Sequence, residues 1–335
     1  MDQNNSKIGI VILSWNDPQN TIELVESIFK SDYQNYDVII VDNNSSTYNF
    51  NKLLVDLGNK DFHHKLISEN ETLDEKEKFL KNVFIIRSTE IANYKFAENI
   101  GVSRGYNKGI KFVITNNYDF LIKFDCDFII SSKLISGMIK TFEENKNAVA
   151  VSPKVYYFIK KKTKIIWWKG VNFTRNYFRF QRTGMGANRK EIDNGQFKGI
   201  SKSEGICGCC VMLKTDAVIK TGLLDIDFFF GPEDIEHAFR LKNYGDLLVN
   251  LDYHAYHKVS QSIFVSGIKK RIYFETIGWL TLIKKVCNLK DRLAGYCYFL
   301  LRGVSHLIRY IFLKEKDAHL GFVLGLKDFF LKNKF

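Results

Sequence analysis

The sequence predicts an α/β fold: a mostly parallel, Rossmann-like central sheet flanked by helices, with a helical extension at the C-terminus. Three observations support this prediction. Short β-rich apolar segments alternate with segments of helical periodicity from residue 8 onward. Polar groups able to bind ligands follow the strands, as in sheets that bind ligands beyond the carboxyl ends of their strands. From about residue 265 the pattern is helical only, and Lys and Arg alternate with aliphatic and aromatic residues.

Composition and charge limit the possible functions. The chain has 335 residues, which allows one large α/β domain with an appendage or two modest domains, and 45% of them are hydrophobic, which supports a core. Only 3 prolines argue against long disordered linkers. We place a first domain at 1–262 and a basic, amphipathic helical region at 263–335. Residues 1–257 carry 34 Lys and Arg against 32 Asp and Glu, a net +2, whereas 258–335 carry 15 against 5, a net +10. A basic tail on a near-neutral body favours an anionic membrane surface as partner over nucleic acid.

Cysteine usage and the termini indicate a location. The 6 cysteines do not form paired zinc-ligand motifs, so free thiols in a reducing compartment are expected. The N-terminus is polar and lacks signal-peptide features. No uncharged apolar run reaches the roughly 18–20 residues that a spanning helix needs. We therefore expect a cytoplasmic protein, peripheral at the inner face of the cytoplasmic membrane; the sequence leaves its oligomeric state open.

The first strands are the clearest elements. Residues 8–14 form an apolar run typical of a buried parallel strand, a turn follows at 15–18, and 21–31 has helical spacing. Residues 36–42 predict a second strand that ends in a polar loop, which completes a βαβ unit. Residues 51–82 are polar with a helical tendency around 73–80, and 83–86 predict a third strand.

The next strand ends in two acids. A Gly- and Asn-rich loop at 99–109 is predicted to lead into a helix at 110–115; such a loop favours phosphate binding or only shapes a turn. Residues 120–124 predict the fourth strand, which delivers Asp125 and Asp127 to the edge of the sheet. There they could hold a divalent cation against a phosphate, or they form a solvated turn.

Two later clusters also carry candidate chemistry. After a helix at 131–144 and strands at 149–157 and 205–213, three aromatics and a Gly-Pro turn lead into Glu233 and Asp234, at the start of a helix to 243. These acids either cap that helix or include a general base. His254 and His257 follow a short strand at 248–251 and are structural or metal ligands. The helical tail is either an interfacial segment or a cap on the catalytic domain.

The order of these motifs resembles the family 2 glycosyltransferases of GT-A fold, and within them a bacterial rhamnosyltransferase-like branch. The resemblance covers about residues 7–262 well and continues weakly to 320–328. The matching segments are Ile10–Asn16, Ile40–Ser46, Glu98–Gly101, Gly105–Gly109, Asp125–Asp127, Gly208–Leu213, Gly222–Asp225, Phe228–Phe230, Glu233–Glu236 and His257–Ser260. Segment 51–98 is longer and more charged than the resemblance leads us to expect.

The resemblance implies roles for individual residues. Asp234 would be the general base, with Glu233 beside it. Asp127, Asp125 and His257 would hold Mg²⁺ or Mn²⁺ on the donor diphosphate. The donor-binding residues implied are Ser14, Asn16, Asp42, Asn44, Asn99, Gly101, Asn107 and Asp125.

The implied activity is inverting, metal-dependent transfer of a sugar from a nucleotide donor, dTDP-rhamnose or a UDP-hexose. The acceptor would be a glycan or a lipid-linked molecule in cell-surface polysaccharide synthesis. Two other readings stay open: a non-enzymatic carbohydrate-binding or scaffold protein, and a sugar-phosphate nucleotidyltransferase. The latter predicts a Gly-rich, basic signature after the first strand, where this chain has Ser14 to Asp17.

Overall fold

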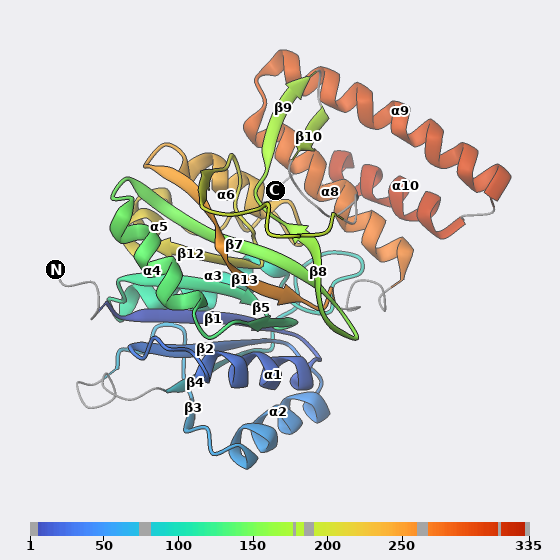
Figure 1. Ribbon diagram of the computed structural model, residues 1–335. Helices are drawn as coiled ribbons and strands as arrows, with labels where there is room; N and C mark the ends of the chain where they lie inside the picture. Colours follow the sequence, from blue (N-terminus) through green and yellow to red (C-terminus); the bar gives the residue numbers. More distant parts are fainter. Residues whose placement is uncertain are drawn as a thin grey trace.

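The architecture is that of a computed structural model, which describes residues 6–73, 82–176, 179–183, 191–259, 267–313 and 316–331. A mixed sheet of 11 strands forms the centre, helices cover it, and three C-terminal helices lie together at one side (Figure 1). The α/β prediction is therefore confirmed. The helical tendency predicted at 73–80 lies almost entirely outside the described residues.

The N-terminal half is built from parallel strands. Strands β1, β2 and β4 lie where 8–14, 36–42 and 83–86 predicted them, and β1 pairs with β2 on one side and β5 on the other. The elements of this half are β1 (Ile8–Ser14), α1 (Pro18–Phe29), β2 (Tyr36–Asn43), α2 (Thr47–Asn59), β3 (His64–Leu66), β4 (Val83–Ser88), α3 (Val102–Thr115) and β5 (Phe120–Asp125). In the β1–β5 register Leu13 faces Asp125, so the ends of these strands meet at one edge of the sheet.

The sheet changes direction at β12 (Cys210–Lys214), which pairs antiparallel with β5 and with β7. The main strand order is β11-β13-β7-β12-β5-β1-β2-β4-β3, and β6 and β8 join the sheet by pairing with β13 and β7. The other elements of this half are β6 (Phe128–Ile130), α4 (Leu134–Glu144), β7 (Ala148–Ile159), β8 (Lys161–Trp168), β9 (Asn172–Asn176), β10 (Arg179–Thr183), β11 (Ile200–Lys202), α5 (Thr215–Thr221), α6 (Glu233–Leu241) and β13 (Asp246–His257).

Strand β13 is longer than the four residues predicted at 248–251. Its second part pairs with β6, the short strand directly after the acid pair, and His257 lies opposite Phe128 in that register. The long strand therefore carries a histidine 130 residues away in sequence to the edge where Asp125 and Asp127 lie.

Helix α3 begins earlier than predicted. The loop expected to extend to residue 109 ends at Gly101, which has φ 86°, a left-handed conformation that suits glycine. Gly105 and Gly109 belong to the helix and let it approach the sheet, because a methyl group at either would lie within 2.6 Å of Leu13 or Val11. These glycines serve helix–sheet packing.

Three helices complete the chain: α8 (Ile268–Val286), α9 (Leu289–Leu313) and α10 (Lys316–Leu331). They share a small apolar cluster that includes Leu280, Phe299 and Phe322. Helix α8 also reaches the body, because Phe274 stacks on Phe229 with ring centroids 4.1 Å apart. None of the helices that the structure describes combines the length and the apolar character needed to cross a bilayer.

Candidate active site

A cavity of ≈ 930 Å³ opens at the carboxyl ends of β1 and β5. Three groups of side chains with predicted roles meet there: the acids after β5, His257 at the end of β13, and the acids that begin α6. Among the predicted residues, those that line the cavity are Asn99, Gly101, Asp125, Asp127, Glu233, Asp234 and His257. Segments far apart in the sequence thus form one site.

Asp127 and His257 form one wall of the cavity. Asp127 Oδ2 and His257 Nε2 lie 3.1 Å apart, and both side chains are largely buried. The imidazole is held between two rings: Phe128 stacks on it with centroids 4.5 Å apart, and Trp167 meets it edge-on at 4.4 Å. These contacts fix the ring orientation and aim its nitrogen at the carboxylate.

Asp125, at the end of β5, is hydrogen-bonded to helix α3. Its Oδ1 accepts a hydrogen bond of 2.6 Å from the Tyr106 hydroxyl, a buried group on α3. Burial, together with the charge of Asp127, raises the pKa of the Asp125 carboxyl. Across the described ranges, no three His, Cys, Asp or Glu side chains are grouped closely enough to hold a metal ion. The Tyr106 hydrogen bond engages one oxygen of Asp125, and the part of Asp125 in the predicted set of three ligands stays a prediction.

The Asp127–His257 pair nevertheless fits a hard divalent cation. Two ligands at right angles and at about 2.1 Å from Mg²⁺ or Mn²⁺ lie roughly 3 Å apart, which matches the observed separation. Such ions commonly take one or two protein ligands and complete their coordination with substrate phosphates. Three more acids line the cavity: Asp17, Glu98, which is ion-paired with Lys270, and Glu275, which is ion-paired with Arg271. Acids therefore outnumber bases in the wall, and a cation beside a bound diphosphate would offset this charge.

The second acid pair begins helix α6. Glu233 is buried, and burial together with the charge of Asp234 raises the pKa of its carboxyl to about 7. The positive charge of Lys123 opposes that rise in pKa. This side chain is fully buried on β5, with its Nζ 4.3 Å from the centre of the Tyr106 ring. Asp234 is only partly buried, and its Oδ1 accepts a hydrogen bond from the Ile235 backbone N–H. Asp234 is thus the better placed of the two to meet a substrate hydroxyl.

Gly208 explains part of the small-residue segment at 205–213. A methyl group at Gly208 would lie 2.6 Å from Cβ and 3.0 Å from Oδ2 of Asp234. Cys207 and Cys210 are buried in the core, and the Cys207 and Cys209 sulfurs lie 3.7 Å apart. At Gly208 this segment therefore approaches a neighbouring element closely, and the neighbour is a candidate catalytic side chain.

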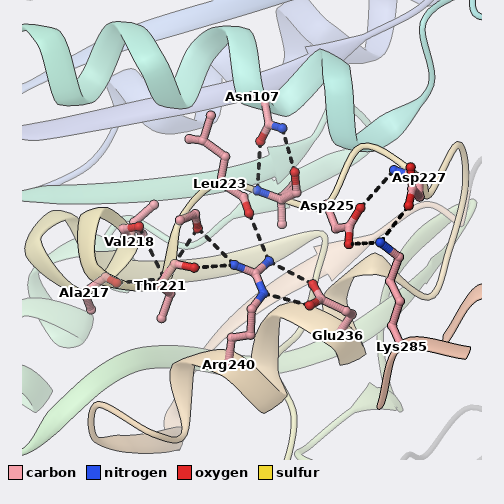
Figure 2. A network of polar contacts seen from close by, with 12 residues as sticks. Asn107, Ala217, Val218, Thr221, Leu223, Asp225, Asp227, Glu236, Arg240 and Lys285 are labelled. Carbon is pink, nitrogen blue, oxygen red and sulfur yellow. Dashed lines mark hydrogen bonds and ion pairs between the residues drawn. The ribbon is translucent and has the colours of Figure 1, made fainter. Parts of the chain in front are cut away.

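A polar network anchors α6 and the turn before it (Figure 2). The Arg240 guanidinium forms a two-point ion pair with Glu236, at 2.7 and 2.8 Å, one helical turn away. It also donates to the backbone carbonyls of Thr221 and Leu223. Lys285 of α8 bridges Asp225 and Asp227, both at 2.6 Å. The segment leading to Glu233 and Asp234 is thereby held from both sides.

Asn107 belongs to this network and not to the cavity wall. Its side chain donates to the carbonyl of Leu224 at 2.8 Å and accepts from the Leu224 N–H at 3.0 Å (Figure 2). Both polar atoms of its amide therefore join α3 to the segment before α6. Its predicted role in donor binding stays a prediction.

Four other predicted donor-binding residues also lie beside the cavity without lining it. Ser14 Oγ lies 2.7 Å from Thr21 Oγ1, and Asn16 Oδ1 accepts from the Ser46 N–H. Asp42 is buried, and the Asn44 side chain donates to the Glu98 carbonyl at 2.8 Å. None of these four residues is among the described residues that line the cavity. Burial raises the pKa of the Asp42 carboxyl, against the nearby charge of Arg87. These residues shape the loops that carry their neighbours Trp15 and Asn43 to the cavity.

The cavity has further walls that sequence reasoning missed. The missed lining residues include Leu13, Trp15, Asp17, Asn43, Trp167, Trp168, Gly208, Phe229 and, from α8, Lys270, Arg271, Phe274, Glu275 and Trp279. Trp15 to Asp17 directly follow β1, so the rule that ligands bind beyond strand ends could have found them. The α8 residues carry no such local signal.

A sequence model of one family, Glycosyl transferase family 2, matches residues 9–220, well over half of the chain. The chain belongs to this family. The matched range contains Asp125 and Asp127 but ends before Glu233, Asp234 and His257. For those three residues the geometry of the cavity is the evidence. A search of curated proteins found no significant match.

Solved structures of glycosyltransferases share the fold at low identity. GalNAc-T7 with UDP, GalNAc and Mn²⁺ has a TM-score of 0.55 and 15% identity, over 76% of this chain and 44% of its own length. Residues 1–349 of S. aureus TarS have a TM-score of 0.52 and 12% identity, covering 96% of this chain and 80% of TarS 1–349. The mannosyltransferase PcManGT from Pyrobaculum calidifontis, solved with GDP-Man and Mn²⁺, has a TM-score of 0.52 and 9% identity, over 99% and 88%. The GT-A fold prediction agrees with these neighbours.

Proposed function

We propose that this protein transfers a sugar from a nucleoside-diphosphate donor to an acceptor hydroxyl by a single inverting displacement. One observation carries the proposal: the Asp127–His257 pair and the Glu233–Asp234 pair line the same ≈ 930 Å³ cavity. One pair suits a cation on the leaving diphosphate, and the other suits a base for the incoming hydroxyl. A direct displacement requires these two functions, and no covalent intermediate.

Asp234 is the proposed base. Its carboxylate accepts the proton of the acceptor hydroxyl as that oxygen attacks the anomeric carbon, and the bond from that carbon to the diphosphate breaks. Gly208 beneath it and the anchored turn before α6 hold its position. Glu233, whose pKa is raised to about 7, keeps the local negative charge low while it is protonated. Asp234 is the carboxylate of the pair that lies partly exposed at the cavity.

Asp127 and His257 are the proposed holders of Mg²⁺ or Mn²⁺, and Asp125 keeps a supporting position through Tyr106. A cation bound there neutralises the charge that develops on the departing diphosphate. Two fold neighbours, GalNAc-T7 and PcManGT, were solved with Mn²⁺. The donor-binding wall is proposed to be Trp15, Asn43, Asn99 and Gly101, with the predicted Ser14, Asn16, Asp42 and Asn44 supporting their loops.

The donor is proposed to be dTDP-rhamnose or a UDP-hexose. The rhamnosyltransferase-like motifs favour dTDP-rhamnose. The UDP in the solved structures of GalNAc-T7 and of TarS 1–349 favours a UDP-hexose. The acceptor is a glycan or a lipid-linked molecule in cell-surface polysaccharide synthesis. The net +10 of residues 258–335 supports a location at the cytoplasmic face of an anionic membrane.

An Asp234→Asn variant tests the proposal after a panel of nucleotide-sugars with Mn²⁺ has identified the donor by thermal shift. We expect turnover to fall by roughly 10²–10⁴-fold while the thermal shift with the donor is retained. Asp216→Asn is the matched control, because Asp216 is also an acid in the first turn of a helix but is exposed. Unchanged turnover in Asp234→Asn would remove Asp234 from the mechanism. If the wild-type protein binds the donor but turns it over with none of the acceptors, the non-enzymatic scaffold reading is favoured. If it releases diphosphate from a nucleoside triphosphate, a nucleotidyltransferase is favoured.

A further inference from the structure

Helix α9 carries an exposed apolar stripe along its whole length. At 100° per residue, nine large aliphatic or aromatic residues fall within an arc of about 140°. These residues are Leu289, Leu293, Leu300, Leu301, Val304, Leu307, Ile308, Ile311 and Phe312, and every one is exposed, with Leu301 at 70% and Phe312 at 75%. Monomeric soluble proteins seldom expose a continuous apolar surface of this extent without a partner for it.

The stripe is not the packing face of the helix. That face lies on another side, where Phe299 is buried with Phe322 and Leu280. Gly295 and Gly303 allow the close approach, because a methyl group at these positions would lie 2.9 Å from Ile283 and 3.0 Å from Phe322. Helix α9 is therefore already seated on α8 and α10, and the stripe is left over. In Figure 1, α9 is the outermost of the three helices and lies away from the sheet.

The charge of the region selects the partner. Residues 258–335 carry 15 Lys and Arg against 5 Asp and Glu. A second copy of this chain would bring two basic regions together, whereas an anionic bilayer offers negative headgroups beside an apolar interior. We infer that the α9 stripe is a membrane-docking surface that lies in the interface of an anionic bilayer. This inference gives a specific site to the membrane location in the proposed function, on which it rests.

Docking through α9 places the cavity close to the membrane. Helix α8 packs on α9 and also lines the cavity with Lys270, Phe274 and Trp279. Its Gly278 lies so close to the turn before α6 that a methyl group there would lie 1.9 Å from the Gly231 carbonyl oxygen. Helix α8 thus connects the helix that carries the docking surface to the wall of the cavity. This arrangement suits an acceptor whose sugar or phosphate head projects from the bilayer, which assigns the lipid-linked class of acceptor.

Vesicle co-sedimentation of the full chain tests the inference. Wild-type protein should sediment with phosphatidylglycerol-containing vesicles, less with pure phosphatidylcholine vesicles and less at high salt. The triple variant Leu301→Asn/Ile308→Asn/Phe312→Asn should lower the partition coefficient by about tenfold or more, because three apolar side chains no longer enter the interface. The matched control is Tyr48→Asn/Val55→Asn/Ile219→Asn, three exposed apolar residues on α2 and α5, which should bind vesicles like wild type.

The outcomes separate this inference from the proposed function. Nucleotide binding with Mn²⁺ and donor hydrolysis in solution should be unchanged in the α9 variant, since its substitutions lie outside the cavity. Equal vesicle binding by the α9 variant and wild type would overturn the inference and leave the activity standing. So would a wild-type dimer in sedimentation velocity that the α9 variant converts to monomer. Vesicle binding without turnover of any donor would refute the proposed function alone.

Discussion

Replacing Gly208 by alanine should disable catalysis and spare nucleotide binding. The added methyl group would lie 2.6 Å from Cβ of Asp234 and 3.0 Å from its Oδ2, closer than carbon atoms pack. The Asp234 side chain must then move by roughly 1 Å, and a misplacement of that size can reduce the rate by about 10²-fold. Gly208 does not have a left-handed φ, so alanine is acceptable to the backbone.

The assay compares three quantities for Gly208→Ala and wild type: the melting temperature, the affinity for the nucleotide with Mn²⁺, and kcat. We expect a similar fold and an affinity within about twofold, because the metal wall at Asp127 and His257 is formed by other elements, with kcat lowered about 10²-fold. Gly58→Ala on α2 is the control, since a methyl group there meets nothing closer than 4.0 Å. A Gly208→Ala enzyme with wild-type kcat would refute the assignment of Asp234 as a precisely placed base.

Three further substitutions test other parts of the site. The melting temperature of Glu233→Gln should rise relative to that of the wild type between pH 5 and pH 8. Burial raises the pKa of Glu233 to about 7, so ionisation in that range lowers the stability of the wild-type fold, whereas glutamine does not ionise. Thermal scans that show no pH-dependent difference would contradict this. Asn107→Ala should destabilise the protein by about 1–3 kcal/mol in denaturant titrations, because it leaves the Leu224 N–H and carbonyl unpaired, and the KM for the donor should not change. A raised KM at full stability would instead support its predicted role in donor binding. His257→Ala should raise the Mn²⁺ concentration needed for half-maximal activity by about 10-fold or more. His254→Ala is the control, because His254 lies outside the cavity wall, and it should not change this concentration. Equal metal requirements in the two variants would count against His257 as a metal ligand.

Much of the fold could be predicted because its signals are local. Strands β1, β2 and β5 are continuous apolar runs that end in polar residues, so strand limits and candidate ligands appear together in the sequence. The same holds for the acids that begin α6, which follow a Gly-Pro turn. Asp127, His257, Glu233 and Asp234 could therefore be predicted as site residues, and the structure places all four at the cavity.

The remaining features depend on contacts between distant residues. Asn107 lies in a Gly- and Asn-rich segment typical of a phosphate-binding loop, yet its partner is Leu224, 117 residues later. The α3 glycines look like loop residues until β1 is seen packed against them. Asp125 is hydrogen-bonded to a hydroxyl on another helix, and the α8 wall comes from a region whose sequence signals only charge and helicity. No short-range pattern encodes such pairings.

The position of a bound cation tests the central claim most directly. Crystals of the full chain grown with Mn²⁺ and the donor identified by thermal shift, or with UDP, would be measured at the manganese absorption edge. We predict one anomalous peak in the cavity, within about 2.3 Å of Asp127 and of His257 Nε2, with the diphosphate completing its coordination. Nucleotide bound in the cavity with the anomalous peak elsewhere, or with none, would contradict the assignment of Asp127 and His257 as the metal site.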